Sequence, residues 1–193
     1  MDLQRAQAVL VPADATELDI ALLWTRAPGK LRKLKKLDLR TIAISLDASH
    51  QPLEAVEALA ERSSDGAITH HRDALDDSGG RGSPSFTIYP SAIDERVADV
   101  LFFVVCFEGD DLTKAAALGF SLTDRTTGVT VARSEFPSAT SRLQAALIAR
   151  IHRMDGWAVQ SVGAPVPRPP TAAVTRTDQL AAFSAAFTRE NDD

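Results

Sequence analysis

The sequence is poor in cysteine and contains no long apolar run. Its 193 residues include a single cysteine, Cys106, so an intramolecular disulfide and a thiolate-based zinc site are both excluded. No apolar stretch approaches the roughly 18 residues that a membrane-spanning helix needs. The N-terminus also lacks the basic flank and continuous apolar stretch of a signal peptide. We therefore expect a cytoplasmic chain without a membrane span.

Familiar catalytic motifs are absent as well. The sequence has no Gly-x-Ser-x-Gly elbow, no Walker-type phosphate loop and no dinucleotide glycine motif. The strongest enzymatic interpretation uses His70 or His71 as a base and Asp73 as its orienter, with Ser78 or Ser83 as the nucleophile. These residues share one glycine-rich loop, which does not build the rigid geometry that a triad needs. We interpret both histidines as exposed residues that point to opposite faces, and we predict that the chain is not an enzyme.

Composition and proline placement predict one domain followed by a short tail. The chain is 45% hydrophobic and 24% charged, and a chain of this length buries roughly 70% of its unfolded surface, enough for one core. Four prolines lie between positions 165 and 170. We therefore place the domain at residues 1–163, and a proline-rich linker with a short C-terminal helix at residues 164–193. Leu180, Phe183 and Phe187 form one stripe of that helix, which must dock on the domain, on another copy or on a partner.

Short branched or alternating runs, separated by Pro, Gly and polar clusters, predict a mainly β fold. The segment Val97–Phe107 is apolar enough to be a central strand, and Cys106 within it is expected to be buried. Two segments favour helix instead. Residues 52–62 begin with a proline and contain strong helix formers, and residues 141–154 carry a helix-like apolar stripe, although 148–152 could equally open a strand. The predicted strands lie at 8–11, 18–24, 37–46, 67–70, 86–89, 97–107, 112–124, 128–136 and 157–162.

The net charge of −5 conceals two oppositely charged segments. Residues 26–40 hold seven basic residues and one acid, whereas residues 54–77 hold seven acids and two basic residues. The basic segment is either an anion site or a solvated loop whose leucines pack. The sequence pI of about 5.4 and the absence of interleaved exposed aromatics argue against a dedicated nucleic-acid-binding protein. The basic residues in question are Lys30, Arg32, Lys33, Lys35 and Lys36.

Several stretches, in order, resemble the bacterial tellurium-resistance and general-stress family known as TerD. The resemblance covers roughly residues 8–163. No single piece is decisive, but so many in register are hard to obtain by chance. The pieces are 19–24, 37–39, 65–75, 100–105, 124–128, 131–133, 155–157 and 162–163.

The resemblance implies a β-sandwich of two mostly antiparallel sheets with a few short helices. It also implies a calcium site built from an Asp-x-Asp pair on one strand, an aspartate in a His-x-x-Asp loop and a later acid. Asp38 matches the first position of the pair and Asp73 the loop position, while Arg40 stands in place of the second aspartate. The guanidinium would supply internally the positive charge that Ca²⁺ supplies elsewhere. Asp76 and Asp77 could restore ligands, so the site is either vestigial or still binds calcium.

These observations together predict a non-catalytic stress-response module that binds other stress-response proteins or copies of itself. Its expected contact surfaces are the basic segment, the acidic loop at 73–77 and the tail with Phe183 and Phe187. Two alternatives remain open. One is an anion- or nucleic-acid-binding module that acts through residues 30–36, and the other is a functional calcium-binding protein of the family.

Overall fold

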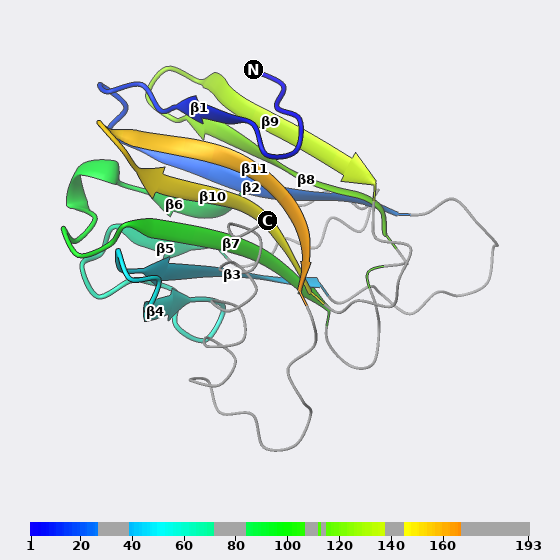
Figure 1. The fold of residues 1–193 in the computed structure, drawn as a ribbon, viewed down its shortest axis with the longest axis horizontal. Coiled ribbons are helices and arrows are strands. Elements are labelled where there is room, and N and C mark those ends of the chain that lie inside the picture. The colour runs from blue at the N-terminus through cyan, green and yellow to red at the C-terminus, as the bar shows by residue number, and fades with distance from the viewer. Residues whose placement is uncertain (27–38, 72–83, 107–111, 113–114, 138–144, 167–193) are drawn as a thin grey trace.

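The chain folds into two β-sheets that pack face to face (Figure 1). The computed structural model describes residues 1–26, 39–71, 84–106, 112, 115–137 and 145–166. Neighbouring strands within each sheet are antiparallel. The predicted mainly β sandwich is confirmed.

One sheet has six strands in the order β1-β11-β10-β7-β3-β4, and the other has five in the order β5-β6-β2-β8-β9. The described part of the chain contains one complete helical element, the 3₁₀ turn η1 (Pro90–Ala92). None of its described helices is long and apolar enough to cross a membrane. The strands are β1 (Ala8–Leu10), β2 (Leu18–Arg26), β3 (Leu39–Leu46), β4 (Pro52–Val56), β5 (Ile68–His70), β6 (Pro84–Ile88), β7 (Asp99–Cys106), β8 (Ala115–Asp124), β9 (Val129–Pro137), β10 (Ala145–Arg153) and β11 (Trp157–Val166).

The main core lies between the two sheets. Because side chains alternate along a strand, Val100, Phe102 and Val104 of β7 face the second sheet and are fully buried. The ring of Phe102 meets Phe86 of β6 edge-on, with centroids 5.4 Å apart. Each such buried side chain contributes about 1.5–3 kcal/mol to folding. Strand β7 pairs with both β10 and β3, so its predicted central position is confirmed, and Cys106 is buried at its end.

A hairpin joins β8 and β9 of the five-stranded sheet at Gly128. Strands β8 and β9 pair from Asp124↔Val129 to Ala117↔Pro137. Gly128 adopts a positive φ of 71° in the connecting turn, which glycine tolerates without steric cost. The carboxylate of Asp124 accepts hydrogen bonds from Thr126 N (2.9 Å) and Thr127 Oγ1 (2.7 Å). The Asp-Arg-Thr-Thr-Gly piece of the sequence is therefore a turn that is stabilised by hydrogen bonds between its own residues.

The helix predicted at residues 52–62 is wrong. Residues Pro52–Val56 form β4, which pairs with β3, and Ala55 and Val56 are buried on opposite faces of the sheet. A tight turn then bridges Glu57 and Ala60. Helix propensity is worth less than about 1 kcal/mol per residue and yields to a strand partner that buries both faces.

The helix-like stripe at residues 141–154 lies on a strand where the structure describes it. Strand β10 spans Ala145–Arg153, and its register shifts between Leu147 and Ala149. The bulge resets the alternation, so Ala146, Ile148, Ala149 and Ile151 all join the core between the sheets. Because of the bulge, the apolar residues on this face of β10 are one or two positions apart, not always two. In the sequence, this irregular spacing resembles the apolar stripe of a helix.

Candidate functional site

Most of the predicted site lies outside the residues that the structure describes. This applies to the predicted calcium ligands Asp38, Asp73, Asp76 and Asp77. It applies equally to the predicted binding residues Lys30, Arg32, Lys33, Lys35, Lys36, Phe183 and Phe187, and to Ser78 and Ser83. Arg40, His70 and His71 are described.

Arg40 lies near the start of β3, on the side that faces away from the second sheet. It is exposed, whereas the next residue, Thr41, is 1% exposed. The Oγ1 atom of Thr41 lies 2.9 Å from Nε2 of His70. Because successive side chains of a strand point to opposite faces, Arg40 is directed away from His70, where the predicted His-x-x-Asp segment begins.

His70 is a core residue, so the expectation that it is exposed is wrong. It is 3% exposed, and its ring meets Phe86 edge-on with centroids 5.0 Å apart. Desolvation by burial lowers the pKa of His70, and the nearby Glu61 carboxylate only partly offsets this effect. His70 is therefore a neutral histidine that joins β5 to Thr41 of the other sheet.

His71 points the other way, as predicted for two adjacent residues at a strand end. It is exposed, and its Nε2 atom lies 2.7 Å from Oγ1 of Thr87 on β6. The Thr87 hydroxyl donates in turn to Oδ1 of Asp19 on β2, at 2.6 Å. Thr87 and Asp19 are paired across the two strands. These three side chains form a hydrogen-bonded row on the outer face of the five-stranded sheet.

The direction of the hydrogen bonds in this row follows from its donors. An ionised carboxylate only accepts, and a threonine hydroxyl has one proton to give. That proton goes to Asp19, so the Nε2 atom of His71 donates to Thr87. A nucleophilic hydroxyl would have to donate to the histidine instead, and Thr87 is 2% exposed. The row positions Asp19 and does not activate a hydroxyl.

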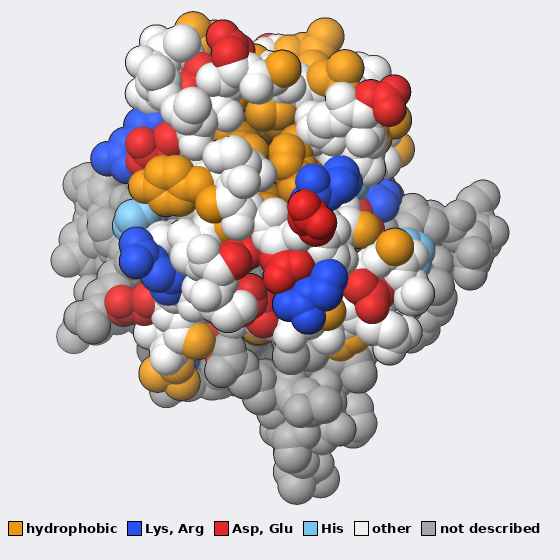
Figure 2. Space-filling model, turned by 90° about the vertical axis from the view of Figure 1, so that its left-hand side faces the viewer, with side chains coloured by type: hydrophobic (Ala, Val, Ile, Leu, Met, Phe, Trp, Pro, Cys, Tyr) orange, Lys and Arg blue, Asp and Glu red, His pale blue; other side chains and the backbone are white. Residues whose placement is uncertain are grey.

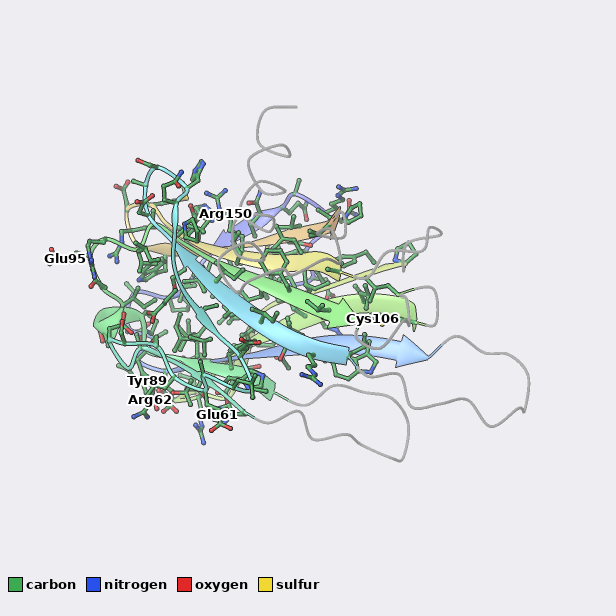
Figure 3. The ribbon with its side chains drawn as sticks, turned by 90° about the horizontal axis from the view of Figure 1, so that it is seen from below. Glu61, Arg62, Tyr89, Glu95, Cys106 and Arg150 are labelled. Carbon is green, nitrogen blue, oxygen red and sulfur yellow. The ribbon has the colours of Figure 1, made fainter. Side chains whose placement is uncertain are left out.

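Arg125, from the β8–β9 turn, extends the row to a second carboxylate. Its Nη1 atom lies 2.6 Å from Oε1 of Glu17, and its Nε atom lies 3.8 Å from Oδ2 of Asp19. The hydroxyl of Tyr89 also donates to Glu17, at 3.3 Å. The hydrogen bond to Glu17 raises the pKa of the Arg125 guanidinium. In Figure 3, Tyr89 marks the side of this sheet and Arg150 lies on the opposite outer side of the sandwich. We call Glu17, Asp19, His71, Thr87 and Arg125 the Glu17–Asp19 cluster.

The Glu17–Asp19 cluster does not by itself fit a calcium ion. Ca²⁺ takes six to eight oxygen ligands, whereas residues 1–26, 39–71, 84–106, 112, 115–137 and 145–166 contain no group of three or more His, Cys, Asp or Glu side chains placed for a metal. The guanidinium of Arg125 already lies against both carboxylates. A planar cation that bridges two acids compensates their charge without a metal. The described cluster is therefore an arginine-neutralised acid pair.

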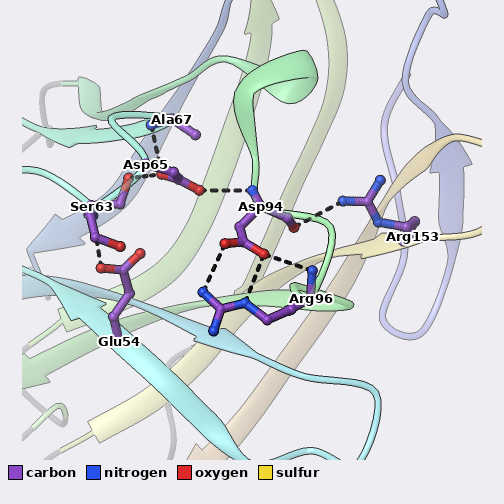
Figure 4. A network of polar contacts seen from close by, with 8 residues as sticks. Glu54, Ser63, Asp65, Ala67, Asp94, Arg96 and Arg153 are labelled. Carbon is purple, nitrogen blue, oxygen red and sulfur yellow. Dashed lines mark hydrogen bonds and ion pairs between the residues drawn. The ribbon is translucent and has the colours of Figure 1, made fainter.

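A second polar network fixes the loops at one end of the sandwich (Figure 4). Asp65 accepts hydrogen bonds from Ser63 Oγ (2.6 Å), Ala67 N (2.8 Å) and Asp94 N (2.9 Å). The hydrogen bonds to Asp65 lower its pKa despite the opposing effect of burial. Arg96 binds the Asp94 carboxylate through Nε and Nη2, which lowers the pKa of Asp94 to about 2. Figure 2 shows acidic and basic side chains interspersed on this end of the molecule.

The Asp65–Asp94 network explains one piece of the family resemblance structurally. Asp65 precedes Gly66, which has a positive φ of 73°, and the Asp65 carboxylate closes this turn by accepting from residues on both sides of it. The same carboxylate holds the backbone of the loop before β7. The Asp-Gly pair thus forms the turn before β5, and its aspartate ties this turn to the loop before β7.

Sequence reasoning did not identify Glu17, Asp19, Thr87 or Arg125 as site residues. Glu17 and Asp19 are two acids at positions i and i+2 at the start of a strand, a spacing that puts both on one face, and this signal was available. The contribution of Arg125 could not be predicted in this way, because 108 positions separate Arg125 from Glu17 in the sequence. The register Leu18↔Asp124 brings the two residues together.

The fold and its cluster define the class of this protein: an antiparallel β-sandwich module with a polar, charge-paired outer face on its five-stranded sheet. The model of the TerD domain family matches residues 1–169. The chain belongs to the TerD domain family.

Two solved structures share the fold. One, described as protein SAV2460 of unknown function, is 21% identical, with a TM-score of 0.62, and the match covers 81% of this chain and 92% of that one. The other, SCO6318 from Streptomyces coelicolor A3(2), is described as a homologue of the telluride resistance protein TerD. It is 18% identical, with a TM-score of 0.57, and the match covers 85% of this chain and 98% of that one. A search of curated proteins finds no match to the chain.

Proposed function

We propose that this chain is a non-catalytic, cytoplasmic stress-response module of the tellurium-resistance type, which binds other proteins or further copies of itself. Membership of the TerD domain family supports the type of module. A protein of similar fold that is described as a TerD homologue supports it further. The chemistry of recognition comes from the two oppositely charged segments of the chain.

One contact relates the two segments within the fold, and it carries this proposal. The basic segment, residues 26–40, leads into β3, and the acidic segment, residues 54–77, contains β5. The 2.9 Å contact between Thr41 and His70 places the start of β3 beside the end of β5. Oppositely charged segments in one chain favour contact with a partner of mixed charge, including a second copy. Such contact weakens as salt screens it.

The Glu17–Asp19 cluster supports the absence of catalysis. Its one buried hydroxyl, on Thr87, donates to a carboxylate, and its cation lies against two carboxylates. An activated nucleophile would require the reverse hydrogen bond and access for a substrate. A hydrolase activity that disappeared in Asp73→Ala would contradict this part of the proposal.

Sedimentation of the full chain at low and high salt tests the proposal. We expect assemblies larger than a monomer at low salt, which dissociate as salt rises. The variant Lys33→Gln, Lys35→Gln, Lys36→Gln should lose this self-association. The matched control, Arg5→Gln, Arg133→Gln, Arg153→Gln, removes the same charge from exposed positions outside both charged segments and should behave as the parent.

Two outcomes count against self-association. Identical sedimentation of the parent at low and high salt contradicts it, and so does equal behaviour of the two triple variants. A mobility shift of nucleic acid that depends on Lys33, Lys35 and Lys36 would favour the anion-binding alternative instead.

A further inference from the structure

The outer faces of the two sheets differ in character. The five-stranded sheet presents the Glu17–Asp19 cluster and half-buried residues such as Leu23. The six-stranded sheet instead presents apolar side chains, each of them at most 8% exposed. We call this second set the outer apolar cluster: Ile42, Ile44, Leu46, Ala55, Leu101, Phe103, Ala145, Leu147, Ala164 and Val166.

The alternation of β7 shows that the outer apolar cluster is separate from the main core. Val100, Phe102 and Val104 pack between the sheets, whereas Leu101 and Phe103 belong to the other cluster. Leu101 and Phe103 are nevertheless 0% exposed. A side chain on a bare outer face would be open to water, so this face is covered.

No strand in the described part of the chain supplies that cover. Every described strand belongs to one of the two sheets, and the five-stranded sheet packs on the inner face. The turn η1 lies at the end of the sandwich, where Pro90 accepts a hydrogen bond from Trp157. Trp157 packs against the main core. The exposed fractions refer to a single chain, so a second copy does not account for them.

We propose that the C-terminal tail, residues 167–193, lies across the six-stranded sheet and covers the outer apolar cluster. Strand β11 ends at Val166, which is itself a fully buried member of the cluster. The tail therefore starts from the cluster it would cover. The stripe of Leu180, Phe183 and Phe187 predicted for residues 178–187 gives the tail an apolar face of its own.

The dimensions and composition of the tail suit this role. A helix of ten residues is about 15 Å long, which spans about three strands at a spacing of about 4.8 Å. Two other segments that adjoin strands of this sheet are less suitable. Residues 138–144 read Ser-Ala-Thr-Ser-Arg-Leu-Gln, and residues 107–111 read Phe-Glu-Gly-Asp-Asp. Neither segment repeats an apolar residue at helical spacing.

This proposal goes beyond the proposed function, because it assigns Phe183 and Phe187 to the chain's own sheet. Partner recognition is then left to the charged segments. The tail would keep from solvent an apolar sheet face that would otherwise be an aggregation or docking surface.

Thiol labelling of two reporter cysteines in the full chain tests the proposal. In a Cys106→Ala background, Val162→Cys reports on the outer apolar cluster, since Val162 is half-buried against it. Leu23→Cys, half-buried on the other sheet, is the matched control. Each reporter is combined with the tail variant Phe183→Asp, Phe187→Asp. Ala185→Asp, on the opposite side of the predicted helix, introduces an acid without removing the stripe.

We expect the tail variant to speed labelling of Val162→Cys by about tenfold or more, because uncovering no longer requires the tail to be displaced. Labelling of Leu23→Cys should not change, and Ala185→Asp should affect neither reporter. An unchanged rate at Val162→Cys overturns the proposal. A rate that falls with rising protein concentration in the parent background overturns it in favour of a second copy.

If the tail variant unfolds the domain, labelling will accelerate equally at both reporters. A second, less disruptive pair of substitutions in the tail then keeps the test decisive. The pair Phe183→Ala, Phe187→Ala removes apolar contact without placing charge against the sheet. Selective acceleration at Val162→Cys then supports the proposal, and equal rates with and without this pair overturn it.

Discussion

The hydroxyl of Thr87 on β6 donates a 2.6 Å hydrogen bond to the Asp19 carboxylate on β2, while His71 lies 2.7 Å away on its other side. A buried hydroxyl thus fixes an acid that is itself partly open to solvent. The side chain of Asp19 is 26% exposed, and Arg125 approaches it from the solvent side. Thr87 therefore holds Asp19 in place, and Arg125 compensates the charge of Asp19 and of Glu17.

Thr87→Val should destabilise the protein by about 1–3 kcal/mol, because Asp19 and His71 lose a buried partner while the shape of the side chain is kept. Thr123→Val is the control, since Thr123 is half-buried beside Asp19 in the register of β8, and its change should stay within about 0.5 kcal/mol. Urea unfolding measures both variants. Equal losses in the two would show that the hydroxyl of Thr87 has no special role.

Calcium should act on the Glu17–Asp19 cluster only when its arginine is removed. In the parent protein, millimolar CaCl₂ should leave the melting temperature where it is in EDTA, because Arg125 already compensates both acids. In Arg125→Ala the uncompensated carboxylates should gain stability from the cation, since a ligand that binds only the folded state raises its stability. Arg133→Ala, which removes an exposed arginine on β9, is the control.

Either of two results would contradict this prediction. A rise of the parent's melting temperature with calcium would mean that residues outside the described ranges complete a metal site despite Arg125. The absence of any calcium effect in Arg125→Ala would mean that the paired acids cannot recruit the ion.

Acid should weaken the clamp that Asp94 forms with Arg96. The pKa of Asp94 is lowered to about 2 in the fold, from 3.8. An acid with a depressed folded pKa stabilises the fold above its unfolded pKa, and this contribution is lost as pH falls from 3.8 towards 2. The melting-temperature difference between the parent and Asp94→Asn should therefore shrink across that interval. A constant difference for Asp94→Asn across this interval would refute the assignment.

Close packing of β8 on β9 should make Gly119 intolerant of a side chain. A Cβ atom at Gly119 would clash with the backbone oxygen of Ser134 on β9. Gly119→Ala is expected to cost about 1–3 kcal/mol of unfolding free energy, because backbone must shift to admit the methyl group. Ser121→Ala, two residues along the same strand, should change stability by less than about 0.5 kcal/mol. Chemical denaturation that ranks the two variants equally would contradict the geometry.

The sandwich could be predicted because its central strands carry their own signals. The run in β7 is apolar on both faces, and both faces are buried. The turn at Gly128 requires a residue that accepts a positive φ. Strand β4 carries no such signal, since its residues favour helix and become a strand only by pairing with β3. Strand β10 was also difficult to predict, because its bulge gives the apolar residues a spacing that resembles that of a helix.

The site was harder to predict than the fold. Its two acids are two positions apart in sequence, but Arg125 and Thr87 reach them from 108 and 68 positions away. Alternation also separates residues that the sequence places together. His70 turns into the core and His71 outwards, so neighbours with the same side chain occupy different environments. Only strand register decides which distant polar groups share a face.

The burial of His70 predicts a second pH dependence, at mildly acidic pH. Burial lowers its pKa below 6.5, and desolvation together with Arg150 lowers the pKa of His152. A base with a depressed folded pKa contributes stability that is present above its unfolded pKa and is lost as pH falls below it. Unfolding free energy should therefore decrease between about pH 7.5 and 5.5, with a smaller slope in His70→Gln, which has no proton to take up. Equal slopes in the parent and His70→Gln would show that His70 is not buried in its neutral form.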